Sequence, residues 1–218
     1  MNYFAHGVAH LDDSYVVAGT AVPDWLNVVD RRVRVRPRQT APLLCDSGAN
    51  PAAVARGILQ HHDDDRWFHR SRAFTELSLQ LTVVVRDVLA GDEGFRPSFL
   101  GHILVEILLD SILIDENPGQ LDRYYDVLSN VDAAEVAQVV ERITGQSVSL
   151  LATFIPRFID ERFLPDYLDD EKLLWRLNQV MRRVRLPLLP ERFQEIFPAA
   201  RHRVAARSDE LMAGPTNR

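Results

Sequence analysis

The chain has 218 residues, of which 46% are hydrophobic and 26% are charged, a globular composition that excludes disorder and fibrous structure. Its 25 basic and 31 acidic residues give a formal net charge of −6, which argues against a general duplex-binding protein. Cys45 is the only cysteine, so no internal disulfide forms, and the first residues lack a signal-peptide pattern. We therefore expect a cytoplasmic protein.

Apolar residues recur at three- and four-residue spacing over most of the chain, and few segments alternate with a period of two. This pattern predicts an all-α fold, organised as a single-domain helical bundle over residues 1–213, with a flexible tail at 214–218. A helix is expected to open at Asn50-Pro51 and to run through the sequence HHDDD. Further helices are expected at 72–89, 98–114, 121–128, 133–144, 148–163, 170–183 and 190–211.

The N-terminal segment offers His6 and His10, one helical turn apart, and Asp24, which follows Pro23. Taken alone, each of these residues more often packs or caps a helix than binds a ligand. They become candidate metal ligands only if other segments also supply His, Asp or Glu side chains.

A basic run, RRVRVRPR, covers Arg31 to Arg38. One interpretation is an exposed, solvated strand or loop. The other is a docking surface for an anionic substrate or partner.

The first polar cluster places His61, Asp65 and His69 at positions i, i+4 and i+8, on one face of a helix. Imidazole and carboxylate groups are suitable ligands for Zn, Mn or Fe. The alternative is a run of exposed polar residues on a surface helix, which is what we expect for Asp63 and Asp64.

The second cluster is GHILVEILLD, in which His102, Glu106 and Asp110 repeat the same spacing. Neighbouring members lie about 6 Å apart along the axis and can share an ion, whereas the outer two lie about 12 Å apart, which implies a second ion or a supporting role. An amphipathic surface helix is the alternative, but apolar neighbours leave the polar stripe narrow. The charges also favour a buried helix over a membrane span.

Several helical segments thus offer His, Asp or Glu side chains. Metal-dependent hydrolase centres in helical bundles are assembled from such side chains on separate helices. No nucleophilic-serine elbow or phosphate-binding glycine loop is present, so metal-activated water is the expected nucleophile. We expect the two polar stripes to face each other.

The order of motifs resembles the acyl carrier protein phosphodiesterase family, a divergent branch of the helical HD-type phosphohydrolases. The resemblance is carried by MNYFAHGVAHL, AGTAVPDW, GILQHHDDD and PERFQEIFPAARHRVAA. Gly57, His61 and Asp65 fall at the matching places. The chain departs from the family pattern at His102 and Glu106, where the family has two aspartates, and His69 replaces an acid.

The resemblance implies an HD-like helical fold, a divalent metal, and hydrolysis of the phosphodiester that links phosphopantetheine to acyl carrier protein. The histidine content favours Zn, Mn or Fe over Mg. The expected metal ligands are His6, Asp24, His61, Asp65, His69, His102 and Glu106. The expected catalytic residues are Asp65, Glu106 and Asp110. The expected docking residues for acyl carrier protein are Arg31, Arg32, Arg34, Arg36 and Arg38.

Two other functions fit parts of the same pattern. One is a zinc-dependent phospholipase C-like or nuclease-like hydrolase, because such sites are helical and rich in histidine. The other is a non-catalytic helical interaction protein with a structural metal.

Overall fold

The computed structural model describes residues 1–214. Within this range the chain forms twelve α-helices and four short 3₁₀ helices, and no strand. The predicted all-α class is therefore confirmed. The predicted tail lies outside the described residues, apart from Gly214.

The helices form two compact units. Unit 1 contains Met1, Trp67–Glu116 and the chain from Phe163 onward, and unit 2 contains Asn2–Arg66 and Asn117–Arg162. The boundary at Arg66 falls inside helix α4 (Ala49–Phe68), so this helix contributes residues to both units. The expectation of a single domain stays a prediction.

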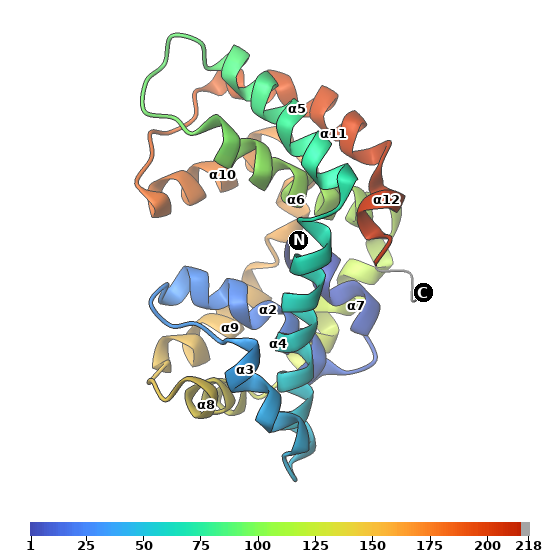
Figure 1. The fold of residues 1–218 in the computed structure, drawn as a ribbon, viewed down its shortest axis with the longest axis vertical. Coiled ribbons are helices and arrows are strands. Elements are labelled where there is room, and N and C mark those ends of the chain that lie inside the picture. The colour runs from blue at the N-terminus through green and yellow to red at the C-terminus, as the bar shows by residue number, and fades with distance from the viewer. Residues whose placement is uncertain (215–218) are drawn as a thin grey trace. The chain divides into compact units, whose positions relative to one another are not determined.

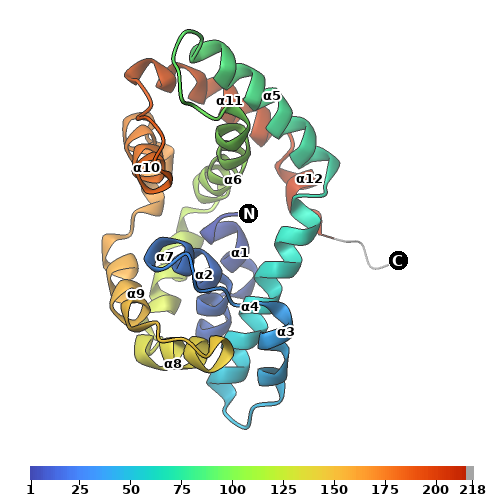
Figure 2. The same ribbon diagram turned by 60° about the vertical axis from the view of Figure 1, so that its left-hand side comes forward.

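Unit 2 is built around α2, whose side chains from Val17 to Val22 are buried. The other helices include α8 and α9, which lie side by side (Figure 2). The bounds are α1 Tyr3–Gly7, α2 Ser14–Val29, α3 Pro37–Thr40, α7 Pro118–Ser129, α8 Ala133–Thr144 and α9 Ser149–Glu161, with 3₁₀ helices at Val8–His10 and Ala41–Cys45.

Two glycines allow α2 and α4 to approach closely. A Cβ atom at Gly57 would lie 2.1 Å from the carbonyl oxygen of Val16, and one at Gly19 would lie 2.4 Å from that of Val54. Any larger residue at either position would separate the helices. The contact matters because Thr20 follows Gly19 directly and His61 lies one turn after Gly57.

The helix α2 was not predicted. Gly19 is a weak helix former, and Pro23 has no N–H group to donate to the Gly19 carbonyl. The helix continues through both residues because its apolar side chains are buried, including Trp25 at its far end. Asp24, which follows Pro23, lies inside this helix.

Unit 1 contains the long hairpin of α5 (Arg72–Val88) and α6 (Pro97–Glu116), which lie side by side (Figure 1). A Cβ atom at Gly101 would lie 2.6 Å from Thr82 Oγ1, so this glycine sets the close approach of the two helices. The remaining elements are α10 Asp170–Val184, α11 Phe197–Ala205 and α12 Ser208–Met212, with 3₁₀ helices at Leu164–Leu168 and Glu191–Ile196. The predicted helix at 190–211 was wrong in extent, since the structure divides it into three short pieces.

The helix α6 is long and apolar enough to cross a membrane by length and composition, and 61% of its apolar window is buried inside the protein. Leu104, Val105, Leu108 and Leu109 are fully buried in unit 1. These contacts are those of the buried core helix that the sequence predicts.

Candidate functional site

Three metal-ligating side chains meet in unit 2. His6 lies in α1, and His61 and Asp65 lie one turn apart in α4; we call these three residues the buried histidine group. The Nε2 atom of His6 lies 3.4 Å from Asp65 Oδ1, and the Nε2 atom of His61 lies 3.5 Å from Asp65 Oδ2. The two imidazole rings stack with their centroids 4.1 Å apart. All three residues were predicted as metal ligands.

The Nδ1 atoms of both histidines are held by other residues. The Nδ1 atom of His61 donates to the carbonyl oxygen of Thr20 at 2.8 Å, and since a carbonyl only accepts, this nitrogen carries the proton. The Nδ1 atom of His6 donates to Asp64 at 3.1 Å, while its Nε2 atom is buried and has no hydrogen-bond partner among residues 1–214. Histidines fixed at one nitrogen, with the other directed into a common space, are arranged as metal ligands are.

The spacing of the donors fits a single divalent ion. With bonds of about 2.1 Å, two ligands of a tetrahedral ion lie about 3.4 Å apart. The separations between Asp65 and the two histidine nitrogens match this value. Two imidazoles and one carboxylate are a donor set suited to Zn, Mn or Fe.

The electrostatics of the buried histidine group favour a cation. Burial lowers the pKa of His6, but the carboxylates of Asp64 and Asp65 outweigh it and raise that pKa to about 9. Burial also opposes ionisation of Asp65, yet the interactions with His6 and His61 hold its pKa well below the usual range. A positive charge is therefore stable among these residues, as a proton or as a metal ion.

Asp24 lies close to the same group, on the turn of α2 that follows Thr20. Desolvation raises the pKa of its carboxyl, although His61 and His6 act in the opposite direction. The three mutually close donor atoms of the group do not include Asp24. It is therefore a neighbouring carboxyl that holds a proton more readily than an ordinary aspartate does.

The expectation that Asp64 is an exposed polar residue was wrong. Its residue surface is only 7% exposed, and its carboxylate binds His6 and accepts a hydrogen bond of 2.7 Å from Gln60. The spacing contained the signal, because residue 64 is three positions after His61 and so shares its face. Asp63 is exposed and pairs with Arg66, as expected.

A second set of donors meets in unit 1. His69 directly follows the end of α4, and His102 and Glu106 lie one turn apart on α6; we call these the half-exposed histidine group. The Nε2 atoms of His69 and His102 lie 2.8 Å and 3.3 Å from Glu106 Oε1. Burial tends to raise the pKa of Glu106, but the Met1 amino group and the two histidines hold it well below its usual range.

The residues of the two predicted polar stripes are therefore grouped differently in the structure. Because α4 ends at Phe68, His69 leaves the stripe of His61 and Asp65 and joins His102 and Glu106. Asp110, expected to be catalytic, is fully buried and belongs to neither group among the described donors. His69 does face the second stripe as expected, whereas the same expectation for His61 stays a prediction.

The basic run begins with a turn, continues without regular structure from residue 33 to 36, and enters α3 at Pro37; Val33 and Val35 are buried and the arginine side chains are exposed. The Nε2 atom of His62 donates to the Val35 carbonyl at 2.7 Å, which ties the segment to α4 beside His61. Arg32 pairs with Asp30, and Arg34 donates to Asn27. Arg36 and Arg38 make no ion pair within residues 1–214 and are available to an anion.

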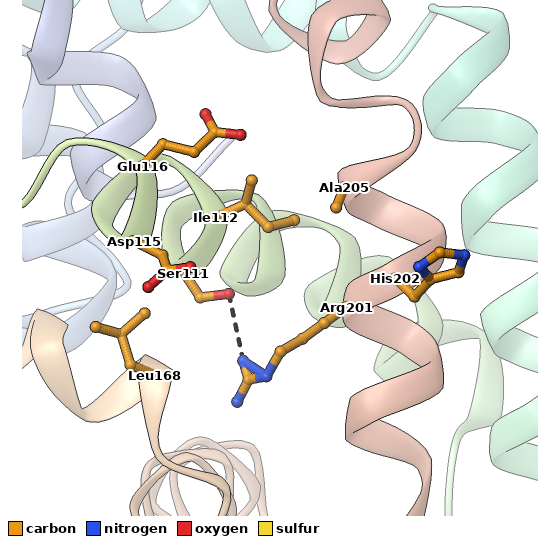
Figure 3. A pocket seen from close by; sticks show the side chains of 8 residues that line it. All are labelled: Ser111, Ile112, Asp115, Glu116, Leu168, Arg201, His202 and Ala205. Carbon is orange, nitrogen blue, oxygen red and sulfur yellow. Dashed lines mark hydrogen bonds between the residues drawn. The ribbon is translucent and has the colours of Figure 1, made fainter.

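A cavity of about 320 Å³ lies in unit 1 between α6 and α11 (Figure 3). The Arg201 side chain reaches across it toward Ser111, and it also donates to the Tyr167 carbonyl and pairs with Asp170. Its guanidinium is thus already used within the fold. The cavity shares no residue with either histidine group.

Comparison with family models, with curated proteins and with solved structures finds no match for this chain. The resemblance to acyl carrier protein phosphodiesterases therefore stays a prediction. Any functional assignment therefore depends on the geometry of the buried histidine group.

Proposed function

We propose that the protein is a metal-dependent phosphoric ester hydrolase whose ion is held by the buried histidine group. The observation that carries this proposal is the buried Nε2 atom of His6, which has no hydrogen-bond partner in the described part of the chain and faces Asp65 beside the Nε2 atom of His61. Such a nitrogen costs stability unless a cation or proton satisfies it. A cation held by His6, His61 and Asp65 would lie near the carboxyl group of Asp24.

Each residue has a distinct task in this proposal. His6, His61 and Asp65 hold the ion, and Asp64 and the Thr20 carbonyl keep the imidazoles in the required orientation. When bound, a divalent ion lowers the pKa of water and neutralises charge on a phosphoryl oxygen. Asp24, whose pKa is raised, accepts the proton from the attacking water or returns one to the leaving oxygen. Asp65, with its depressed pKa, serves as a ligand.

The substrate proposal rests on the basic run. Arg36 and Arg38 are exposed on a segment tied to α4 next to His61, so they offer positive charge to an anionic ester or its carrier. In keeping with the sequence resemblance, we propose the phosphodiester of holo acyl carrier protein as the substrate. A cytoplasmic location forms part of the same proposal.

The test compares Asp65→Asn with Asp63→Asn, two identical changes on one helix. Protein freed of metal with a chelator is given Zn, Mn or Fe, and hydrolysis of bis-p-nitrophenyl phosphate and of holo acyl carrier protein is followed. We expect metal to restore activity to the wild type and to Asp63→Asn, but not to Asp65→Asn. Bound metal without hydrolysis of any ester would instead favour a non-catalytic protein with a structural metal.

A further inference from the structure

The half-exposed histidine group has no task in the proposed hydrolysis. It draws on two segments, the residue after α4 and one turn of α6, and all three of its members lie in unit 1. Its donor atoms lie within 4.8 Å of one another, and it shares no residue with the buried histidine group. The question is what these three side chains bind.

The chemistry of the group is that of a cation site. A single oxygen, Glu106 Oε1, faces the Nε2 atoms of His69 and His102, and the Met1 amino group lies 3.4 Å from it. The two imidazole rings stack with their centroids 4.9 Å apart, and the Nε2 atoms of both rings lie near the same carboxylate oxygen. Two imidazoles and one glutamate are a known donor set for zinc with an open fourth position.

The surroundings hold the donors in place while leaving access. Gly101 allows α6 to approach α5 closely. The ring of Phe74, on α5, contacts both imidazoles, with centroid distances of 4.8 Å to His69 and 4.9 Å to His102. This phenyl ring gives the group an apolar wall. On the other side the His102 side chain is 44% exposed, so that water and ions reach the donors.

We infer that His69, His102 and Glu106 form a second divalent-metal site, which binds its own zinc-class ion with an open coordination position. A bound ion links the turn after α4 to α6 and so stabilises unit 1. This inference does not depend on the proposed hydrolase activity. It concerns binding alone, and it is tested by binding alone.

The test counts the zinc equivalents bound by the metal-free full chain, using calorimetry and elemental analysis. We expect two equivalents for the wild type and one each for His102→Gln and Glu106→Gln. His61→Gln should also bind one, and the double variant His61→Gln, His102→Gln none. His202→Gln, which changes an exposed histidine of α11, is the matched control and should bind two. Circular dichroism of each variant checks that the helices persist.

Three outcomes would overturn the inference. The first is two equivalents retained by both His102→Gln and Glu106→Gln. The second is one equivalent in the wild type that is lost in His61→Gln and in His102→Gln alike, since both groups would then serve one ion. The third is one equivalent lost only in His61→Gln. Two equivalents without ester hydrolysis would leave the second site established and would refute the proposed function alone.

Discussion

The two histidine groups contain the same kinds of donor, two imidazoles and one carboxylate, but their surroundings differ. His6 and His61 are 1% and 4% exposed, and each is fixed through Nδ1 by a second residue. In the half-exposed group the ring nitrogens meet Glu106 at a surface open to water. Donor identity decides whether a metal binds, while burial and orientation decide how tightly it is held. We therefore expect the buried group to bind its ion more tightly and exchange it more slowly.

Removing a ligand of the buried histidine group has the largest expected effect. His61→Ala should lower metal-dependent hydrolysis by more than about 100-fold, because even residues that only support ligands cost 10- to 100-fold. The variant removes one of the two histidines that pair with Asp65, so the thermal stability of the protein should also fall. The hydrolysis rate is measured at saturating metal, the bound metal by elemental analysis, and the stability by thermal unfolding. Full retention of metal and rate would contradict the assignment.

The next effect tests the hydrogen bond between Asp64 and His6. Asp64→Asn weakens the hydrogen bond that orients His6, and we expect metal affinity to fall about 10- to 100-fold, with the maximal rate less affected. Asp63→Asn, the adjacent and exposed control, should leave the affinity unchanged. Competition with a chromophoric chelator measures both. Equal affinities in the two variants would show that Asp64 does not orient a ligand.

The pH dependence of stability is a third test, made on metal-free protein. The folded-state pKa of His6 is about 9, above the ordinary value of 6.5, so its stabilising contribution is complete below pH 6.5 and is lost as the pH rises through 9. We expect the Tm to fall by roughly 5 °C between pH 6.5 and 9.5. In His6→Gln the fall should be much smaller. A Tm that rises over this pH range in the wild type would contradict the predicted direction of the change.

The smallest effect concerns the basic run. The double variant Arg36→Glu, Arg38→Glu should reduce cleavage of holo acyl carrier protein several-fold at low salt, with little change toward bis-p-nitrophenyl phosphate. The difference should shrink as salt screens the charges, since the Debye length is about 10 Å at 0.1 M. Arg182→Glu, Arg203→Glu makes the same change in net charge elsewhere and serves as the control. Equal losses on both substrates would mean that the arginines support the fold.

The sequence predicts the helical class and most donor residues, because periodic apolar spacing and clustered histidines are local signals. It does not predict how the donors are grouped. Periodicity places His69 on the stripe of His61, but the end of α4 at Phe68 directs it to Glu106 instead. The role of Asp64 and the course of α2 through Pro23 likewise depend on tertiary contacts that no single segment contains.

The most direct test of the account is anomalous diffraction from crystals of the full chain soaked with zinc or manganese. We expect an anomalous peak about 2.1 Å from the Nε2 atoms of His6 and His61 and from an oxygen of Asp65. We also expect the Nδ1 atoms of both histidines to keep their hydrogen bonds to Asp64 and Thr20. Crystals with metal bound elsewhere and no peak among these three residues would contradict it.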